Sequence, residues 1–462
     1  MTIERFEVAG LAQFSYMVED SGEAVVIDPM RDISRYLDAA AAKGWKITHV
    51  IETHIHADYA SGAKALAERT GAELAVSAYD AGERFHYSMQ HRGLRDGDVV
   101  QVGEARLNAL HTPGHTPEHL SFVLQQGSSK PTAIFSGDFL FVGALGRPDL
   151  LGEAESARLA VELHRSASER IAALPDALQV YPGHGAGSLC GAGMSDRPES
   201  TLGEERASNP YFGYGEQEFV RKILEASPEM PSYYPLMKEL NSHGAVALES
   251  LPEMKALNPA EVSEASATVI DLRKPEAFGE AHVPGALNLG LAGNLSMWAG
   301  WLLTPETEVI FVGETEEDCR EARTALARVG LDRVAGYLHG GMAAWIAAGR
   351  NVTRTKQATV ADVEQANGAV ILDVRNPTER AHGGIEGALG IPLGELPDTL
   401  KNHAGSLNAG REIVAVCGSG YRSSAAASLL ERAGFEYVSH LAGGMASWET
   451  RCNAKVADRT GD

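Results

Sequence analysis

With 462 residues, of which 44% are apolar and 22% charged, the chain is long enough for about three ordinary globular domains. Its 62 acidic and 40 basic residues give a net charge of −22, which argues against sequence-independent nucleic-acid binding and against docking on anionic membranes. The sequence shows no signal-peptide pattern, no apolar run approaching the roughly 18 residues of a membrane helix, and no disulfide pattern among its four cysteines. These features predict a cytoplasmic protein.

Segments with strand and helix patterns alternate through the first 185 residues, and turn residues, proline or glycine separate them. The expected elements are two strands within 13–28, a helix at 33–42, a strand at 47–51 and a helix at 61–70. A helix at 216–226 follows, and then a connector with Pro228, Pro231 and Pro235 that we expect to be irregular. The pattern predicts a mixed α/β sandwich with loops along one edge, ending near residue 245.

Four loops at expected strand ends carry side chains that can bind metals. They are Thr53-His54-Ile55-His56-Ala57-Asp58-Tyr59, Thr112-Pro113-Gly114-His115, Ser136-Gly137-Asp138 and Tyr181-Pro182-Gly183-His184. A single His-x-His pair is weak evidence, because two surface histidines often have this spacing. Four such loops in this order resemble the metallo-β-lactamase superfamily, and the resemblance implies an αββα sandwich with a metal site at the loops.

The ligand set departs from the usual two-metal pattern at one position. The superfamily run is H-x-H-x-D-H, but Tyr59 occupies the last place. A phenol with a pKa near 10 is a poor zinc ligand, so the second metal position is weakened more than the first. The first position keeps His54, His115 and Asp138, and two imidazoles with one carboxylate are the ligand set of non-haem Fe(II) oxygenases.

Further motifs resemble the persulfide dioxygenases, a mononuclear iron branch related to the hydroxyacylglutathione hydrolases. These motifs are Gly137-Asp138, Gly146-Arg147-x-Asp149, Tyr181-Pro182-Gly183-His184 and Glu204-Glu205-Arg206-x-x-Asn209-Pro210. The resemblance covers most of residues 10–225. It implies that one Fe(II) per chain promotes the reaction of a thiol persulfide with O₂, which yields sulfite and the thiol.

The resemblance also assigns the surrounding residues. His56, Asp58 and His184 are left around a vacant second-metal position, where they still orient the iron ligands. Arg147 is expected to hold a carboxylate of a thiol such as glutathione, and its alternative role is a structural ion pair with Asp149.

Three other side chains near the ligands are open to simpler interpretations. His111 and His119 flank His115, and we assign neither to the metal. Cys190 follows the His184 loop closely, where it is either a buried thiol without a role or a carrier of persulfide sulfur beside the iron.

Beyond residue 245 the chain repeats itself at an offset of about 102 residues. The paired landmarks are Asp271-Leu272-Arg273 with Asp373-Val374-Arg375, Gly285-Ala286-Leu287 with Gly387-Ala388-Leu389, and Gly340-Gly341-Met342 with Gly443-Gly444-Met445. These landmarks resemble the rhodanese family of sulfurtransferases. We therefore expect a metal domain at 1–245, a first rhodanese copy at 246–353 and a second copy at 354–462.

The second copy contains a candidate nucleophile. Cys417 follows the apolar strand 413–416 and precedes a helix expected at 424–433, so backbone N–H groups and the helix dipole can stabilise a thiolate or persulfide. Cys417 and Arg422 are the predicted catalytic residues. The loop residues expected to surround the substrate are Gly418, Ser419, Gly420 and Tyr421.

The first copy lacks this nucleophile. Alignment of the strands places Gly313 opposite Cys417, and the loop that follows is acidic, so we expect an inactive copy that acts as a spacer or dimer surface. Cys319 lies opposite Ser423, and nothing around Cys452 argues for reactivity.

The sequence therefore predicts a persulfide dioxygenase–rhodanese fusion, an enzyme that joins Fe(II)-dependent persulfide oxidation to thiosulfate formation or sulfane-sulfur transfer at Cys417. The thiol carrier could be glutathione, coenzyme A or a similar thiol. The alternative is a two-zinc hydroxyacylglutathione-type thioester hydrolase with a fused rhodanese. We expect a homo-oligomer, either a dimer or a tetramer.

Overall fold

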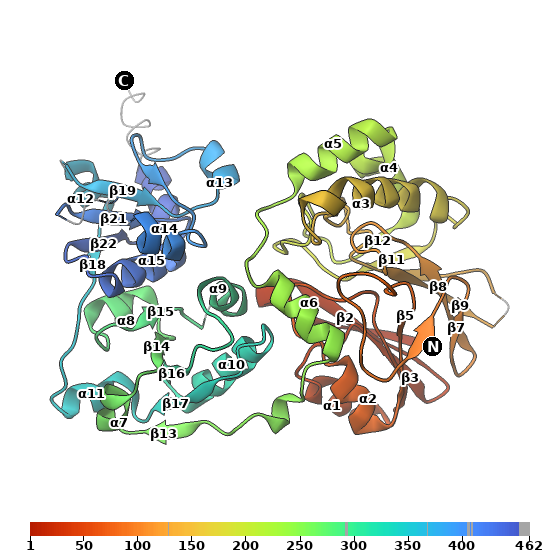
Figure 1. Cartoon of the computed structure of the whole chain (residues 1–462), viewed down its shortest axis with the longest axis horizontal. Coiled ribbons are helices and arrows are strands. Elements are labelled where there is room, and N and C mark those ends of the chain that lie inside the picture. Colours follow the sequence, from red (N-terminus) through yellow and green to blue (C-terminus); the bar gives the residue numbers. More distant parts are fainter. Residues whose placement is uncertain (128, 292–293, 367, 404–406, 408–409, 452–462) are drawn as a thin grey trace. The chain divides into compact units, whose positions relative to one another are not determined.

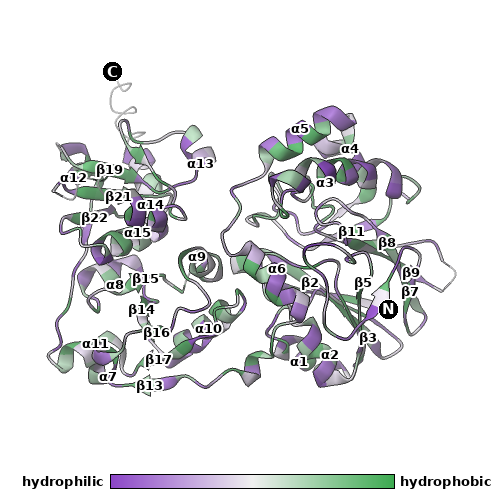
Figure 2. Cartoon of the chain, viewed as in Figure 1, coloured by the Kyte–Doolittle hydropathy of each residue, from purple (hydrophilic) through white to green (hydrophobic). Residues whose placement is uncertain are grey.

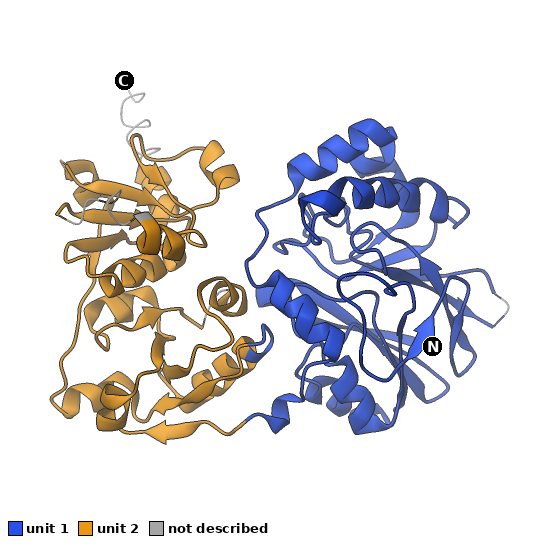
Figure 3. Ribbon diagram, viewed as in Figure 1, with its two compact units in different colours: residues 1–251, 327–330 blue, residues 252–326, 331–462 orange. Residues whose placement is uncertain are grey.

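The computed structural model describes residues 1–127, 129–291, 294–366, 368–403, 407 and 410–451, so Cys452 lies outside the described residues. The chain divides into two compact units, residues 1–251 with 327–330 and residues 252–326 with 331–462 (Figure 3). Within the described ranges, every helix is too short or too polar to cross a membrane.

The first unit is built on two six-stranded mixed sheets (Figure 1). The first sheet contains, in order, β1 (Thr2–Val8), β2 (Gln13–Asp20), β3 (Glu23–Ile27), β4 (Lys46–Ile51), β5 (Glu73–Ser77) and β6 (Arg92–Leu94). The second contains β12 (Ser200–Thr201), β11 (Gln179–Pro182), β10 (Ala133–Gly137), β9 (Leu120–Gln126), β8 (Ala105–His111) and β7 (Val99–Val102). Strands β3 to β6 run parallel, as do β10 and β11.

The two sheets share one apolar core. Phe14, Tyr16 and Val18 point inward from alternate positions of β2 and belong to the same buried cluster as Phe122 and Leu124 of β9. This alternation is the period-two pattern of a strand, and the other face of β2, with Ser15 and Met17, is buried as well. The structure thus has the predicted sandwich, and its fold class is the mixed α/β class that the sequence indicated.

Helices pack on the outer faces of the sandwich. They are α1 (Ser34–Lys43), α2 (Ala63–Thr70), α3 (Glu153–Arg165), α4 (Leu202–Ser208), α5 (Glu216–Ala226) and α6 (Tyr234–His243). Helices α1 and α2 end at Gly44 and Gly71, with φ of 69° and 73°, in the left-handed conformation that glycine adopts without strain. Figure 2 shows hydrophilic and hydrophobic residues interspersed along α3 and α5, as expected for helices that bury one face.

Helix α6 corrects the expectation of an irregular connector after residue 228. Pro235 lies in the first turn of this helix, where a missing N–H costs no helical hydrogen bond. The buried face of α6 includes Lys238 and Asn241, which contact the loop after β4. The prolines therefore introduce a helix that supports the metal-binding loops.

The second unit contains the two repeats, each with a five-stranded parallel sheet of the same strand order. The first copy contains β13 (Lys255–Leu257), α7 (Pro259–Glu264), β14 (Thr268–Asp271), α8 (Pro275–Glu280), β15 (Leu287–Asn288), α9 (Leu295–Leu302), β16 (Val309–Val312), α10 (Glu316–Ala327), β17 (Val334–Leu338) and α11 (Gly341–Ala347). The second contains β18 (Lys356–Ala358), α12 (Val360–Gln365), β19 (Val370–Asp373), α13 (Pro377–Ala381), β20 (Leu389–Gly390), α14 (Leu396–His403), β21 (Ile413–Val416), α15 (Tyr421–Arg432) and β22 (Val438–Leu441).

The two copies pack against each other through α15. The Ser424 hydroxyl donates to the side-chain oxygen of Asn288 at 2.6 Å, and the backbone N–H of Asn288 donates to the Ser428 hydroxyl at 3.1 Å. The same Asn288 side chain donates to the carbonyl oxygens of Asp271 and Arg273. The first copy therefore fixes the helix that follows the Cys417 loop, which is a more specific role than a spacer.

A buried histidine lies near this contact. Neither ring nitrogen of His440 on β22 has a hydrogen-bonding partner within the described residues. Burial lowers the pKa of His440 to about 4, although the carboxylates of Glu276 and Glu431 oppose the shift. Protonation of this ring is thus disfavoured in the folded state.

Because the folded pKa of His440 is below the unfolded value, its contribution to stability is present above about pH 6.5 and is lost as the pH falls towards 4. Urea unfolding of wild type and His440→Leu across this range should show the difference. Over this pH range, the free energy of unfolding of wild type should fall by on the order of 3 kcal/mol more than that of the variant. The same slope in both proteins would contradict this role, and His339→Leu, at an exposed site, is the control.

Candidate metal centre and cysteine loop

The residues predicted as iron ligands converge at one edge of the sandwich. His54 follows β4, His115 lies between β8 and β9, and Asp138 follows β10. Asp138 Oδ2 lies 3.9 Å from His54 Nε2 and 3.5 Å from His115 Nε2. These three buried atoms have no hydrogen-bonding partner in the described part of the chain. Such a set of orphaned donor atoms fits a bound metal ion.

Hydrogen bonds on the far side of each ring direct the free nitrogen toward this position. The Thr53 hydroxyl donates to Asp28 at 2.9 Å and accepts from His54 Nδ1 at 2.9 Å. His115 Nδ1 donates to the carbonyl oxygen of Arg147 at 2.9 Å. Both contacts retain the proton on Nδ1 and leave Nε2 as a lone-pair donor. Burial, with the neighbouring histidines, lowers the pKa of His54 and His115 well below the usual value, so both rings are neutral.

Two glycines allow the loops to approach this closely. A Cβ at position 146 would lie 1.9 Å from the carbonyl oxygen of Asp138, and one at position 183 would lie 2.5 Å from Asp138 Oδ1. These close approaches explain why the two motifs have glycine at positions 146 and 183.

Of the residues predicted around the second metal position, His184 and Asp58 contact each other, whereas His56 contacts Asp28. His184 lies between two carboxylates, 2.7 Å from Asp138 Oδ1 and 2.7 Å from Asp58 Oδ2. Burial opposes the charged ring, but the two carboxylates outweigh it and raise the pKa of His184 well above the usual value. His56 instead hydrogen-bonds to Asp28 at 3.1 Å.

The Tyr59 hydroxyl makes a hydrogen bond to the backbone. The residue is buried, and the hydroxyl donates to the carbonyl oxygen of Asp28 at 3.1 Å. Burial, followed by the nearby carboxylates, raises the pKa of this phenol well above 10. It therefore stays neutral, as the sequence indicated.

The two flanking histidines have structural contacts. His119 Nε2 accepts the backbone N–H of Asp138 at 3.1 Å, and its Nδ1 contacts the Thr112 hydroxyl at 2.9 Å. The ring of His111 stacks on Tyr79 with centroids 3.7 Å apart. Neither joins the metal ligands in the described residues, as expected.

Arg147 has the alternative role considered for it. Its guanidinium makes a two-pronged ion pair with Asp149, at 2.6 and 2.8 Å, and donates to the carbonyl oxygen of Leu189. The side chain is 1% exposed. Arg147 therefore locks the loop whose carbonyl oxygen orients His115, and a contact with substrate stays a prediction.

Sequence patterns missed the support that α6 provides. Asn241 Nδ2 donates to the carbonyl oxygens of His56 and Tyr59 at 2.9 and 2.7 Å, and its Oδ1 accepts the N–H of Ser61. One turn earlier, Lys238 donates to the carbonyl oxygen of Ile55 at 2.7 Å. The only available signal was the three-residue spacing of two polar side chains, which places them on one helix face.

The Cys417 loop has the predicted position between β21 and α15. The N–H of Gly420 donates to Cys417 Sγ at 3.1 Å, and the Ser423 hydroxyl lies 3.5 Å away. The glycine-rich landmark packs under this loop, because Met445 N–H donates to the carbonyl oxygen of Cys417 at 2.7 Å. A Cβ at Gly444 would lie 2.3 Å from that oxygen, so the landmark requires glycine there.

Two neighbours of Arg422 were not predicted. Glu379 of α13 binds its guanidinium through two contacts of 2.6 Å. Trp298 of the first copy faces the same guanidinium, with its ring centroid 6.0 Å from Arg422 Cζ. A second contact with the first copy is the hydrogen bond from the Tyr421 hydroxyl to the carbonyl oxygen of Gly290. The first copy thus supplies part of the surroundings of the Cys417 loop.

In the first copy, Gly313 follows β16 where Cys417 follows β21, as the alignment of strands indicated. A Cβ at Gly313 would lie 2.9 Å from Cys319 Sγ. Burial, followed by Asp318, raises the pKa of Cys319 to about 12. This thiol is therefore protonated and unreactive at neutral pH.

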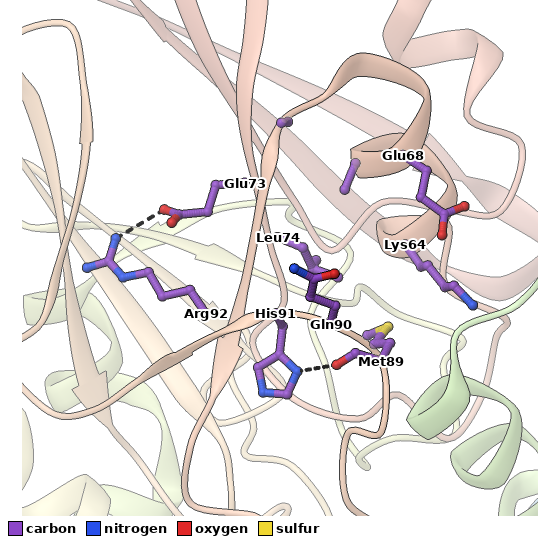
Figure 4. A pocket seen from close by; sticks show the side chains of 10 residues that line it. Lys64, Glu68, Glu73, Leu74, Met89, Gln90, His91 and Arg92 are labelled. Atoms are coloured by element: carbon purple, nitrogen blue, oxygen red, sulfur yellow. Dashed lines mark hydrogen bonds and ion pairs between the residues drawn. The ribbon is translucent and has the colours of Figure 1, made fainter.

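A separate pocket lies by β5, β6 and α2 (Figure 4). In this pocket Arg92 pairs with Glu73 at 3.2 Å, and His91 contacts the carbonyl oxygen of Met89 at 2.7 Å. Lys64 and Glu68 line the opposite side. This pocket includes none of the predicted catalytic or metal-binding residues.

Comparison with protein families matches residues 8–184 to the metallo-beta-lactamase superfamily and residues 255–348 and 357–451 to the rhodanese-like domain. The chain is 32% identical over 243 residues to a hydroxyacylglutathione hydrolase of Polaromonas sp., covering 47% of this chain and 88% of that protein. It is also 32% identical over 214 residues to the mitochondrial persulfide dioxygenase ETHE1 of Bos taurus, covering 45% and 74% of the two chains.

A crystal structure of a metallo-beta-lactamase from Staphylococcus aureus is similar over a longer range. It is 35% identical, with a TM-score of 0.66, and the match covers 73% of this chain and 99% of that one. The chain belongs to the metallo-beta-lactamase superfamily through its N-terminal half and carries two rhodanese-like domains in its C-terminal half. The predicted domain types and their order are confirmed.

Asn241→Ala tests the support from α6. The change leaves two buried carbonyl oxygens and one N–H without partners, so the free energy of unfolding of the first unit should fall by about 2 kcal/mol or more. Urea unfolding measures this loss, and hydrogen exchange at Ser61 locates it. Glu239→Ala, on the exposed face of the same helix, should change stability by less than about 0.5 kcal/mol. Equal stability of the two variants would contradict the assignment.

Proposed function

We propose that the protein is a bifunctional enzyme, an Fe(II)-dependent persulfide dioxygenase joined to a sulfurtransferase. The observation that carries the first activity is the trio of buried, partnerless atoms on His54, His115 and Asp138. Two imidazoles and one carboxylate bind a single iron and leave positions open for a sulfur anion and O₂. Similarity to the persulfide dioxygenase of Bos taurus supports the same reaction.

Bound iron would supply the redox chemistry that transfers both oxygen atoms of O₂ to the terminal sulfur of a persulfide. The balanced reaction is RSS⁻ + O₂ + H₂O → RS⁻ + SO₃²⁻ + 2H⁺. His54 and His115 are held as neutral ligands by Thr53 and by the carbonyl oxygen of Arg147. The charge of Asp138 is balanced in part by the protonated ring of His184. These contacts leave a buried, preoriented ligand set.

The second activity rests on Cys417. Its Sγ receives the Gly420 N–H at the start of a 12-residue helix, an arrangement that stabilises negative charge on sulfur. A persulfide on Cys417 can pass its outer sulfur to sulfite, giving thiosulfate and the thiolate, or to a small thiol such as glutathione or coenzyme A. Sulfite, the first acceptor, is a product of the iron site. A small thiol that receives the sulfur becomes a persulfide, which is the substrate of the iron site.

A zinc-dependent thioester hydrolase is the second candidate. The similarity to the hydroxyacylglutathione hydrolase of Polaromonas sp. favours it. The replacement of a ligand by Tyr59, whose hydroxyl bonds to the Asp28 backbone, disfavours the two-metal form that this chemistry uses. The adjoining sulfur-handling domains also favour persulfide as substrate.

Metal reconstitution separates the two functions. Metal-free protein loaded with Fe(II) should consume O₂ and release sulfite from glutathione persulfide or coenzyme A persulfide, whereas Zn(II) should not support this reaction because it has no redox chemistry. Asp138→Asn should lower O₂ uptake by about 100-fold or more, and Asp38→Asn on the exposed surface of α1 should not. Thioester hydrolysis by the zinc form, with no O₂ uptake by the iron form, would favour the hydrolase.

Sulfur loading tests the second activity. After incubation with thiosulfate, intact-protein mass spectrometry should detect one added sulfur atom in wild type and in Cys319→Ser, but none in Cys417→Ser, because Cys319 is protonated and buried. Loss of loading in Cys319→Ser, or loading of Cys417→Ser, would contradict the assignment of the nucleophile.

A further inference from the structure

We infer that the buried ion pair of Lys238 and Glu118 tunes the iron site, because the positive charge of Lys238 favours Fe(II) over Fe(III). Lys238 is then a positioning residue, which acts on the metal through its charge and through the His54 loop without binding the ion. The inference rests on the proposed function, since an oxygenase with this ligand set uses ferrous iron.

Lys238 and Glu118 hold the residue that follows the first iron ligand. Lys238 Nζ donates to the carbonyl oxygen of Ile55 at 2.7 Å, and the N–H of Ile55 donates to Glu118 Oε1 at 2.9 Å. Nζ and Oε1 lie 3.9 Å apart. Ile55 directly follows His54, and Glu118 lies three residues after His115. The pair therefore joins helix α6 to both loops that carry histidine ligands.

The hydrogen bond to the loop does not by itself explain a charged group at this position. The side chains of Lys238 and Glu118 are 2% and 3% exposed, and the ammonium faces the Phe85 ring at 5.6 Å from its centroid. Burial of a charge is costly, whereas a neutral amide donates to a carbonyl oxygen as well. Asn241 on the same helix satisfies two carbonyl oxygens of the same loop in that way. The charge of Lys238 therefore indicates an electrostatic role.

The iron ligands lie within the electrostatic reach of Lys238. Burial is the main cause of the low pKa of His54 and His115, and the charge of Lys238 contributes in the same direction at both rings. Burial lowers the pKa of Lys238 itself, and the carboxylates of Glu118 and Asp138 are among the groups that oppose this shift. The ammonium thus interacts with all three ligands.

A fixed positive charge beside a metal ion stabilises its lower oxidation state. The couple is Fe(III) + e⁻ → Fe(II), in which the protein neither forms nor breaks a bond. Oxidation adds a positive charge near Lys238, and in a buried site the repulsion is weakly screened. The charge of Glu118 has the opposite effect. Neutralising one partner or the other should therefore shift the midpoint potential in opposite directions.

Spectroelectrochemical titration of the full-length, iron-loaded protein tests this inference. Lys238→Met removes the cation, so the ratio of Fe(II) to Fe(III) at a fixed electrode potential should fall by about tenfold, equivalent to about 59 mV. Glu118→Gln keeps an acceptor for the Ile55 N–H and should raise the ratio. Lys46→Met, at an exposed position of β4, should not change it. The electron paramagnetic resonance signal of Fe(III) measures the ratio, and the iron content of each variant is determined first.

A pair that acts only as a structural clamp predicts a different result. Both variants would then shift the potential in the same direction or not at all, and either outcome would overturn the inference. If Lys238→Met retains no iron, Glu118→Gln decides alone, because a rise in the ratio supports the inference and no rise contradicts it. The titration uses neither persulfide nor O₂, so failure of the dioxygenase assignment in turnover assays would leave these shifts unchanged.

Discussion

The carboxylate of Asp138 is the group on which the metal domain depends. It is fully buried, and its two oxygens serve opposite sides, with Oδ2 toward His54 and His115 and Oδ1 toward His184. An isolated carboxylate at this depth would be strongly destabilising, so the surrounding donors and a cation must compensate for it. The backbone N–H of Asp138 is held by His119, which fixes the residue from behind. The four metal-binding loops therefore converge on one charge.

This constraint explains features that otherwise look unrelated. Gly146 and Gly183 are needed because any side chain there would collide with Asp138. The buried cation Lys238 and the amide of Asn241 satisfy carbonyl oxygens of the His54 loop, which holds its side chains in position around the carboxylate. In the second repeat, Cys417 has an equivalent dependence on backbone donors, and the first copy stabilises the helix that follows it through Asn288.

Patterns local to a strand, a loop or a repeat could be predicted from sequence. The tandem copies repeat their landmarks at a fixed offset, so the repeat followed from spacing alone. The choice of His54, His115 and Asp138 rested on their places at strand ends together with the resemblance to known metal-binding families. The contacts that were missed join residues distant in the chain. Helix α6 reaches the His54 loop across about 180 residues, and Glu379 reaches Arg422 across 43, and no local pattern reports such pairs.

Crystals of iron-loaded protein, measured at the iron absorption edge, would test the central claim most directly. We expect one anomalous peak bonded to His54 Nε2, His115 Nε2 and Asp138 Oδ2, the three atoms that have no other partner in the described residues. Iron at a different set of residues, or none at these three atoms despite confirmed loading, would contradict the account.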